Sequence, residues 1–364
     1  MTVTEVSACA YKIPTDRPEA DGTLAWDATI MVVVTVGDGH DLGLGWTYAG
    51  AGAVAVITDL LAPAVIGTDT SEIPRSAETM ARACRNLGRP GLVASAISAV
   101  DVALWDLRAR QLGVALVDLF GRARDTVPVY GSGGFTTYDD STTETQLATW
   151  VDDWSIPRVK IKIGESWGAE PARDLHRVAL ARRVIGEAEL YVDANGGYTA
   201  KEALRLGRAM SDDHDVRWFE EPVSSDDLAG LARVRSGFRA DVAAGEYGYT
   251  LDYFSKMLDA EAVDCLQADV TRCGGYSVWR QVAALADARH LQISGHCAPN
   301  IHAHVAASVP NLRHVEYFHD HHQIETMLFE GTLPPNGGAM IPDRTRPGHG
   351  MSFRATVADP YRIA

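Results

Sequence analysis

Three acidic residues end three short apolar runs of the sequence. Asp193, Glu220 and Glu246 are spaced by 27 and 26 residues, and each follows residues that are typical of a buried strand. Neighbouring strands lie about 4.8 Å apart, so the three carboxylates are predicted to converge at one edge of a parallel sheet. Carboxylates held together repel one another unless a cation lies between them. Because oxygen-only ligands favour Mg²⁺ or Mn²⁺ over zinc, the pattern predicts a Mg²⁺ site, with Mn²⁺ as an alternative.

Five further residues with useful chemistry end other apolar runs. Lys160 and Lys162 are two apart in a strand, so both point the same way, and their mutual repulsion is predicted to lower a lysine pKa toward that of a base. Asp269 and His296 end consecutive runs, where a carboxylate would orient an imidazole and raise its basicity. Glu316 is predicted either to donate a hydrogen bond as a protonated acid or to pair with a nearby Arg or His.

The elements that must position these residues alternate between strand and helix. From residue 127 onward, short apolar runs are separated by amphipathic segments with helical spacing, for example 171–184 and 277–288. Eight such units predict a (β/α)₈ barrel, whose chemistry lies at the C-terminal ends of the strands. A doubly wound open sheet is the alternative, weakened by the lack of a GxGxxG loop. The eight predicted strands are 127–130, 159–163, 190–193, 216–220, 242–246, 265–269, 292–296 and 313–316.

The first 120 or so residues have a different pattern, with strands followed by helices. A strand over 2–13 and a hairpin of 30–36 and 42–46 precede helices that include 92–112. This order predicts a small α+β unit. The polar loops 15–27 and 48–53 are expected to close over the barrel mouth, so that their residues Arg17, Asp21, Trp26 and Tyr48 help to select the substrate.

The composition excludes several classes of partner. The chain has 364 residues, 46% hydrophobic and 22% charged, which is typical of a globular protein. Its net charge of −15 would repel a phosphate backbone, so nucleic acid is not an expected partner. No apolar run is long enough to span a bilayer, and the N-terminal residues do not resemble a secretory signal. Five scattered cysteines without a CxxC pair predict free thiols in the cytoplasm.

Several segments of the chain resemble motifs of one known family, in the same order and over essentially its whole length. These segments are VKIKIG (159–164), YVDANGGY (191–198), WFEEPV (218–223), AGE (244–246), LQADVTRCGG (266–275), SGH (294–296), HVEYF (314–318) and the helical run 95–113. The chain is similar to the enolase superfamily and, within it, to the mandelate racemase subgroup. Other subgroups would place a lysine near the end of the sixth strand, where this chain has Asp269.

The resemblance implies a particular fold. It is a modified TIM barrel of the (β/α)₇β type with an N-terminal α+β capping domain. The implied domains are a capping domain over 1–125, a catalytic barrel over 126–330 and a C-terminal segment over 331–364 that packs back on the capping domain. The three acidic residues would bind Mg²⁺, Glu220 being the first glutamate of its pair.

The resemblance also implies catalytic roles. Lys162 would be the base on one face of the substrate, with Lys160 as its electrostatic partner. His296, paired with Asp269, would be the acid or base on the other face, and Glu316 would help to stabilise an enediolate. Superfamily sites of this kind use a Lys or His base with Mg²⁺ at the ene-diolate.

The implied reaction is abstraction of the α-proton of a hydroxy-acid carboxylate, most simply in the dehydration of an acid sugar. Racemisation or epimerisation is the alternative, since both outcomes use the same residues. A Schiff-base aldolase using Lys160 or Lys162 would leave the three carboxylates unexplained. A barrel that only binds a sugar acid would not explain why every catalytic position holds a residue suited to catalysis.

Further residues are expected to contact a small carboxylate substrate. The dense cluster 319–322 has no zinc-like spacing and is interpreted as a polar loop at the pocket rim. No membrane partner is expected, whereas association into a homo-oligomer is. The candidate substrate-binding residues are Asn195, Trp26, Tyr48, Tyr247 and His319.

Overall fold

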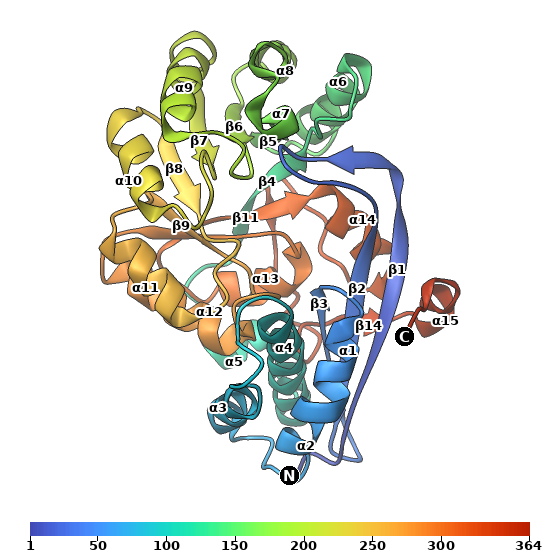
Figure 1. Cartoon of the computed structure of the whole chain (residues 1–364). Helices are drawn as coiled ribbons and strands as arrows, with labels where there is room; N and C mark the ends of the chain where they lie inside the picture. The colour runs from blue at the N-terminus through green and yellow to red at the C-terminus, as the bar shows by residue number, and fades with distance from the viewer.

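A closed parallel barrel forms the larger part of the molecule in the computed structural model, which describes all residues 1–364 (Figure 1). Its eight strands pair in chain order, and the last pairs with the first. The predicted barrel and all eight of its strands are confirmed, with ends that differ by at most three residues. The strands are β4 (Val127–Gly133), β5 (Arg158–Lys162), β6 (Glu189–Asp193), β7 (Val216–Glu220), β8 (Asp241–Ala244), β9 (Cys265–Ala268), β10 (Gln292–Gly295) and β11 (Leu312–Phe318).

Alternate residues of each strand point to opposite sides of the barrel wall. Tyr191 and Trp218 lie in a small cluster inside the barrel, whereas Val192 and Phe219 join the large core between strands and helices. Ile161 also joins that outer core, so its neighbours Lys160 and Lys162 face the interior together, as their spacing predicts.

Helices cover the outside of the barrel (Figure 1). Helix α9 shows how the sequence starts one of them, because Thr199 and Glu202 form a reciprocal capping box. The covering helices are α6 (Asp140–Ala148), α7 (Glu165–Gly168), α8 (Pro171–Ile185), α9 (Ala200–His214), α10 (Leu228–Gly237), α11 (Leu251–Asp259), α12 (Gly275–Asp287), α13 (Pro299–Ala306) and α14 (His319–Leu328). None of the helices of this chain is both long and apolar enough to cross a membrane.

The N-terminal residues form the predicted α+β unit, whose helices lie below the barrel in Figure 1, while β1 and β2 extend upward beside it. An antiparallel sheet packs on helices around a separate core of 20 buried residues. Gly45 allows the last strand to touch helix α4, since a Cβ at that position would lie 2.3 Å from the carbonyl oxygen of Ala99. The elements are β1 (Glu5–Ala20), β2 (Ala25–Gly37), β3 (Leu42–Tyr48), α1 (Gly52–Val56), a π-helical turn (Ile57–Leu61), α2 (Ala62–Val65), α3 (Ile73–Ala83), α4 (Leu92–Leu112) and α5 (Leu116–Phe120).

The predicted loop 15–27 is mostly strand, which corrects the sequence interpretation. Strands β1 and β2 continue beyond a bulge that follows Pro14, and Glu19 pairs with Trp26, so only residues 21–24 form a turn. Because this part of the ribbon is solvent-exposed at several polar positions, the apolar alternation that marks a strand is missing there. The turn nevertheless lies on the barrel mouth, where Gly22 O accepts a hydrogen bond of 2.9 Å from Trp167 N.

The C-terminal segment contacts both parts of the molecule. Strand β13 (Ala339–Met340) pairs with β4, and β12 (Phe329–Glu330) pairs with β14 (Ser352–Phe353). After α15 (Ala355–Ala358), the carbonyl oxygen of Ala364 accepts a hydrogen bond of 2.8 Å from Ala10 N in β1. The domain limits at residues 125 and 330 stay predictions.

Candidate active site

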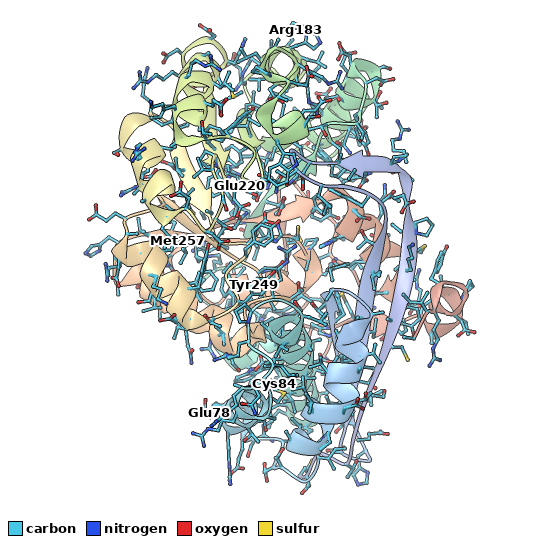
Figure 2. The ribbon with its side chains drawn as sticks, viewed as in Figure 1. Glu78, Cys84, Arg183, Glu220, Tyr249 and Met257 are labelled. Carbon is cyan, nitrogen blue, oxygen red and sulfur yellow. The ribbon has the colours of Figure 1, made fainter.

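Asp193, Glu220 and Glu246 meet at the C-terminal edge of the barrel, as their spacing predicts. Asp193 and Glu220 end β6 and β7 and pair in register, and Glu246 follows β8. All three side chains are buried, and one carboxylate oxygen from each lies within 4.8 Å of the others. Figure 2 shows Glu220 among the barrel strands and Arg183 at the periphery.

This donor set fits a hard divalent cation. Burial raises the pKa of Glu220 to about 8, which reflects the cost of placing several carboxylates together in the interior. Glu246 Oε2 is buried and accepts no well-formed hydrogen bond. This oxygen has His296 Nε2 3.2 Å away but forms no hydrogen bond with it, and it lies beside two other carboxylates. Such a donor set matches the all-oxygen ligand sets of Mg²⁺.

Gly245 explains why the AGE motif needs its glycine. The residue has φ of +136°, and a Cβ there would lie 1.9 Å from the carbonyl oxygen of Gln267. Only glycine can make this approach, which turns the chain sharply between β8 and Glu246.

The two lysines of β5 reach the same carboxylates. Lys160 Nζ is in contact with Glu220 and lies 2.8 Å from Glu316 Oε1 and 3.4 Å from Asp193 Oδ2. Lys162 Nζ lies 2.5 Å from Asp193 Oδ2. Both amines are therefore oriented by the acidic cluster and lie on the β5 side of it.

The lysine pKa values are shifted upward, which contradicts the prediction of a depressed pKa. Burial alone would lower the pKa of Lys162, but Asp193 outweighs both burial and the repulsion from Lys160. Burial likewise opposes the charged form of Lys160, whose pKa is raised by Glu220 and Glu316. The spacing of the two lysines was visible in the sequence, whereas the number of carboxylates around them was not.

His296 faces the acidic cluster from the other side. Its Nδ1 lies 2.9 Å from Asp269 Oδ2, and its Nε2 lies 3.2 Å from Glu246 Oε2. Burial alone would raise the pKa of Asp269, but the hydrogen bond with His296 outweighs burial and lowers this pKa to about 2. Asp269 is therefore a carboxylate that orients the imidazole ring. Burial alone would lower the pKa of His296, but Cys297 and Glu246 raise it above its usual range.

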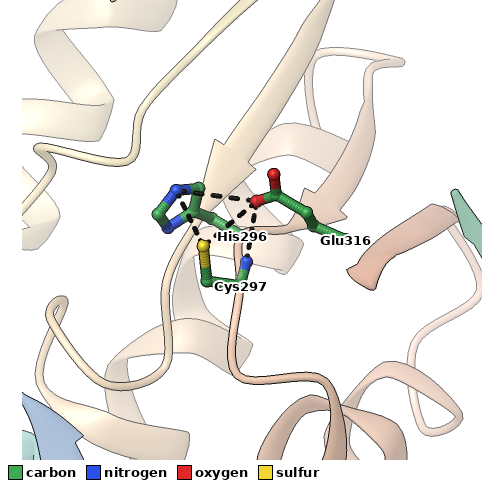
Figure 3. Close-up of side chains that lie close together, drawn as sticks. All are labelled: His296, Cys297 and Glu316. Carbon is green, nitrogen blue, oxygen red and sulfur yellow. Dashed lines mark hydrogen bonds and ion pairs between the residues drawn. The ribbon is translucent and has the colours of Figure 1, made fainter. Parts of the chain in front are cut away.

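Glu316 lies between His296 and Lys160. Figure 3 shows it beside His296 and Cys297. Its Oε2 accepts a hydrogen bond of 2.9 Å from Cys297 N and lies 3.3 Å from Cys297 Sγ. Burial opposes ionisation, but Lys160 and His296 hold the pKa of Glu316 well below its usual range. Of the two predicted states, pairing with neighbouring cations is the one that these contacts favour.

A cavity of 370 Å³ opens above these groups, between the barrel and the N-terminal unit. It includes four of the five candidate substrate-binding residues: Asn195, Trp26, Tyr48 and Tyr247. Tyr48 stacks on His321, with ring centroids 3.4 Å apart, and donates a hydrogen bond to Glu325. The lining residues are Asp21, Leu24, Trp26, Ala28, Thr29, Ile30, Tyr48, Ala49, Gly50, Lys162, Asn195, Glu246, Tyr247, Arg272, His296, Cys297, Phe318, Asp320 and His321.

His319 does not line this cavity, contrary to the sequence prediction. The cluster 319–322 is the first turn of helix α14 rather than a loop. This turn directs Asp320 and His321 toward the cavity and His319 toward Asp16, 3.6 Å away, in a neighbouring cavity that also contains Arg17. Consecutive helical residues point about 100° apart, so the residues of this one cluster line two different cavities.

Arg272 is the main residue of the candidate site that the sequence did not predict. Its Nη1 lies 3.3 Å from Glu246 Oε1, and its Nε lies 3.4 Å from Asp269 Oδ2. The guanidinium thus links the acidic cluster to the His296 side of the site. The only sequence signal is that Arg272 follows Asp269 by three residues, and the turn that folds it back was not predicted.

Glu19 is a buried acid beside the cavity and provides a pH-dependent test of the structure. It is 1% exposed, and its Oε2 accepts a hydrogen bond of 2.9 Å from Trp26 Nε1. Burial, together with Asp320, raises the pKa of Glu19 from 4.5 to about 9. From pH 4.5 to about 9 the unfolded chain releases a proton that the folded protein retains, so this residue's contribution to stability is lost as pH rises.

Glu19→Gln is therefore expected to be less sensitive to rising pH than the wild type. Where the folded and unfolded states differ by one bound proton, the free energy of unfolding changes by about 1.4 kcal/mol per pH unit. Urea unfolding between pH 6 and 8.5 would measure the slope, with the exposed Glu144→Gln as the matched control. Identical slopes for Glu19→Gln and the wild type would contradict the raised pKa.

The barrel, its capping unit and the site identify the class of protein. The sequence matches the family model "Enolase C-terminal domain-like" over residues 142–357 and "Mandelate racemase / muconate lactonizing enzyme, N-terminal domain" over 15–121. The chain belongs to the mandelate racemase subgroup of the enolase superfamily, as its motifs predict.

Two solved structures are similar over the whole fold. A mandelate racemase/muconate lactonizing enzyme-like protein from Rubrobacter xylanophilus is 44% identical with a TM-score of 0.96, covering 100% of both chains. A racemase from Streptomyces coelicolor A3(2) with bound magnesium is 30% identical with a TM-score of 0.92, covering 99% of this chain and 100% of that one.

Two relatives of named activity are similar in sequence. The 3,6-anhydro-α-L-galactonate cycloisomerase of Streptomyces coelicolor is 33% identical over 352 residues, which are 94% of each chain. The L-talarate/galactarate dehydratase of Salmonella typhimurium is 30% identical over 334 residues, which are 90% of this chain and 80% of that protein.

Proposed function

We propose that this protein is a Mg²⁺-dependent enzyme that abstracts the α-proton of a hydroxy-acid carboxylate, and that it dehydrates an acid sugar. The observation that carries the proposal is a cluster of three buried carboxylates flanked by Lys162 from β5 and His296 after β10. The carboxylates lie on β6, β7 and just after β8. Strand β5 lies next to β6, and β10 lies beyond β8, so Lys162 and His296 reach the cluster from opposite sides. The similarity to a dehydratase and to a racemase with bound magnesium supports the same class.

Asp193, Glu220 and Glu246 are the proposed ligands of Mg²⁺. When bound, the cation supplies positive charge to the substrate carboxylate and so makes the neighbouring C–H bond more acidic. The carboxylates that hold Lys162 as an ammonium are the same ones that would bind the cation, so metal binding and the basicity of Lys162 are linked.

Lys162 is the proposed base. Its amine takes the α-proton, and the electron pair of the C–H bond moves into the carboxylate to give an enediolate. Lys160 lies between Glu220 and Glu316 and holds a fixed positive charge near the developing negative charge. Its burial and its three carboxylate contacts make it a poor candidate for a Schiff base, which argues against the aldolase alternative.

His296 is the proposed acid on the opposite face. The imidazolium, oriented by Asp269, gives its proton to the β-hydroxyl group, which leaves as water while the electron pair of the enediolate forms the new C=C bond. The enol product then tautomerises to a 2-keto-3-deoxy acid. Proton return from His296 to the α-carbon would instead give the epimer, and the magnesium-containing racemase keeps this second function open.

Incubation with acid sugars in D₂O containing Mg²⁺ tests the proposal. Proton NMR is expected to reveal a keto-deoxy product from at least one substrate. Deuterium at the α-carbon with an epimer and no loss of a hydroxyl group would assign racemisation instead. The absence of both from a panel of mono- and diacid sugars would contradict the proposed substrate class. Association into a homo-oligomer and a cytoplasmic location stay predictions.

A further inference from the structure

The cavity wall outside the proposed catalytic groups carries two carboxylates without a cationic partner. Asp21 lies in the turn between β1 and β2, and Asp320 lies in the first turn of α14. The cavity cations are already engaged, since Lys162 lies 2.5 Å from Asp193 and Arg272 contacts Glu246. The remaining wall is therefore negative: neither Asp21 nor Asp320 has a Lys or Arg within ion-pair distance, and Lys162 acts on Asp21 only from farther away.

Hydrogen bonds hold both carboxylates in fixed positions, and one oxygen of each carboxylate accepts no hydrogen bond. Asp21 Oδ1 accepts hydrogen bonds of 2.6 Å and 2.8 Å from Thr23 N and Leu24 N, while its Oδ2 accepts none. Asp320 is 4% exposed, and its Oδ2 accepts a hydrogen bond from Thr29 Oγ1. Each free carboxylate oxygen is an acceptor suited to a hydroxyl group.

His321 adds an uncharged donor to the same wall. Its Nδ1 accepts a hydrogen bond of 3.2 Å from Ala298 N, so the ring proton is on Nε2. Burial lowers the pKa of His321 to about 3, and the ring stacks on Tyr48 with an interplanar angle of 11°. The wall thus offers hydrogen-bond acceptors and a neutral donor, which suits hydroxyl groups and not a carboxylate.

We infer that the substrate is a monocarboxylate with an uncharged, hydroxylated chain, an aldonate rather than an aldarate, and that Asp21 and Asp320 select it. This inference rests on the proposed function. One carboxylate of the substrate is accommodated by the catalytic centre. A second would face two unpaired carboxylates in a partly desolvated cavity, where like charges repel strongly.

Matched pairs of acid sugars test the inference. Galactonate with galactarate, and gluconate with glucarate, differ only in the group at carbon 6. With Mg²⁺ at pH 8, the aldonate of a reactive pair is expected to have a kcat/KM on the order of 100-fold higher than its aldarate. Equal or faster turnover of the aldarate would overturn the inference while leaving the proposed function intact.

Binding provides a readout that does not depend on turnover. Lys162→Ala enzyme loaded with Mg²⁺ is titrated calorimetrically with each member of a pair. Tighter binding of the aldonate supports the inference even if the reaction proves to be racemisation, and tighter binding of the aldarate overturns it. Failure of the proposed function would appear separately, as the absence of α-deuteration for every compound.

Charge removal assigns the selectivity to particular residues. Asp320→Asn and Asp21→Asn are each expected to reduce the aldonate preference about tenfold, because each removes one repulsive charge. Asp27→Asn is the matched control, since Asp27 lies between Trp26 and Ala28 on β2 but does not line the cavity. The assignment would be overturned if the ratio of kcat/KM for the aldonate to that for the aldarate were unchanged in both folded test variants. It would also be overturned if the control variant showed the same change in this ratio.

Discussion

Lys162→Ala is expected to lose α-proton exchange together with turnover. The variant removes the only amine on the β5 side that both lines the cavity and contacts Asp193. A positioned general base contributes about 10² to 10⁴ in rate, so kcat is expected to fall by about 10³. Deuterium incorporation from D₂O, followed by NMR, should fall by the same factor.

His296→Asn is expected to separate exchange from product formation. Lys162 remains in place in this variant, so the α-proton on its side of the substrate can still be removed, while no acid remains to release the β-hydroxyl group. The keto-deoxy product should fall about 10³-fold, with much of the α-deuteration retained. This difference distinguishes two residues that would look alike in a simple activity assay.

Matched exposed residues control for general effects of the substitutions. Lys256→Ala removes a lysine whose side chain is 66% exposed, and His176→Asn removes a histidine that is 52% exposed. Both should keep wild-type turnover. Wild-type exchange in Lys162→Ala would show that another group takes the proton, and equal loss of exchange in His296→Asn would assign abstraction to both residues.

Much of the barrel could be predicted because its signals are local. Each strand is a short apolar run, and the chemistry of Asp193, Glu220 and His296 falls at the end of such a run. Strands that pair in chain order bring their ends to one edge, so proximity follows from topology without any knowledge of side-chain conformation. The inward direction of Lys160 and Lys162 follows equally from the two-residue repeat.

Charge states could not be predicted in the same way. The pKa of Lys162 depends on Asp193 in β6, and the ionisation of Glu316 depends on Lys160, so each is a sum over residues from several strands. Sequence spacing identified the repulsion between the two lysines and missed the larger attraction. The direction of a net shift requires all partners and their distances.

The directions of the side chains at the rim of the site could not be predicted, for a conformational reason. His319 was predicted to face the substrate, but a helix begins there and turns it toward Asp16. Arg272 returns to the site through a turn that has no strong sequence signal. A strand end fixes direction with a two-residue period, whereas a turn or a first helical turn can direct each residue differently.

Glu220→Gln is expected to abolish both activity and stabilisation by Mg²⁺. The amide keeps the size of the side chain and an acceptor for Trp218 Nε1, which lies 2.9 Å from Glu220 Oε2, but it removes a proposed ligand charge. A cation at 100 times its dissociation constant stabilises the folded state by about 2.7 kcal/mol. Thermal or urea unfolding with Mg²⁺ and with EDTA should show this difference for the wild type and little or none for the variant, with kcat reduced by at least about 10³.

Glu221→Gln is the sharpest control, because the neighbouring residue is an equally buried glutamate. Glu221 is 1% exposed and Glu220 is fully buried, so the two substitutions disturb equally buried positions. The Glu221 side chain lines a separate cavity with Tyr249 and Tyr253 rather than joining the carboxylate cluster. The Mg²⁺-dependent stabilisation should therefore persist in Glu221→Gln. Loss of that stabilisation in Glu221→Gln with retention in Glu220→Gln would reassign the ligand to the second glutamate of the pair.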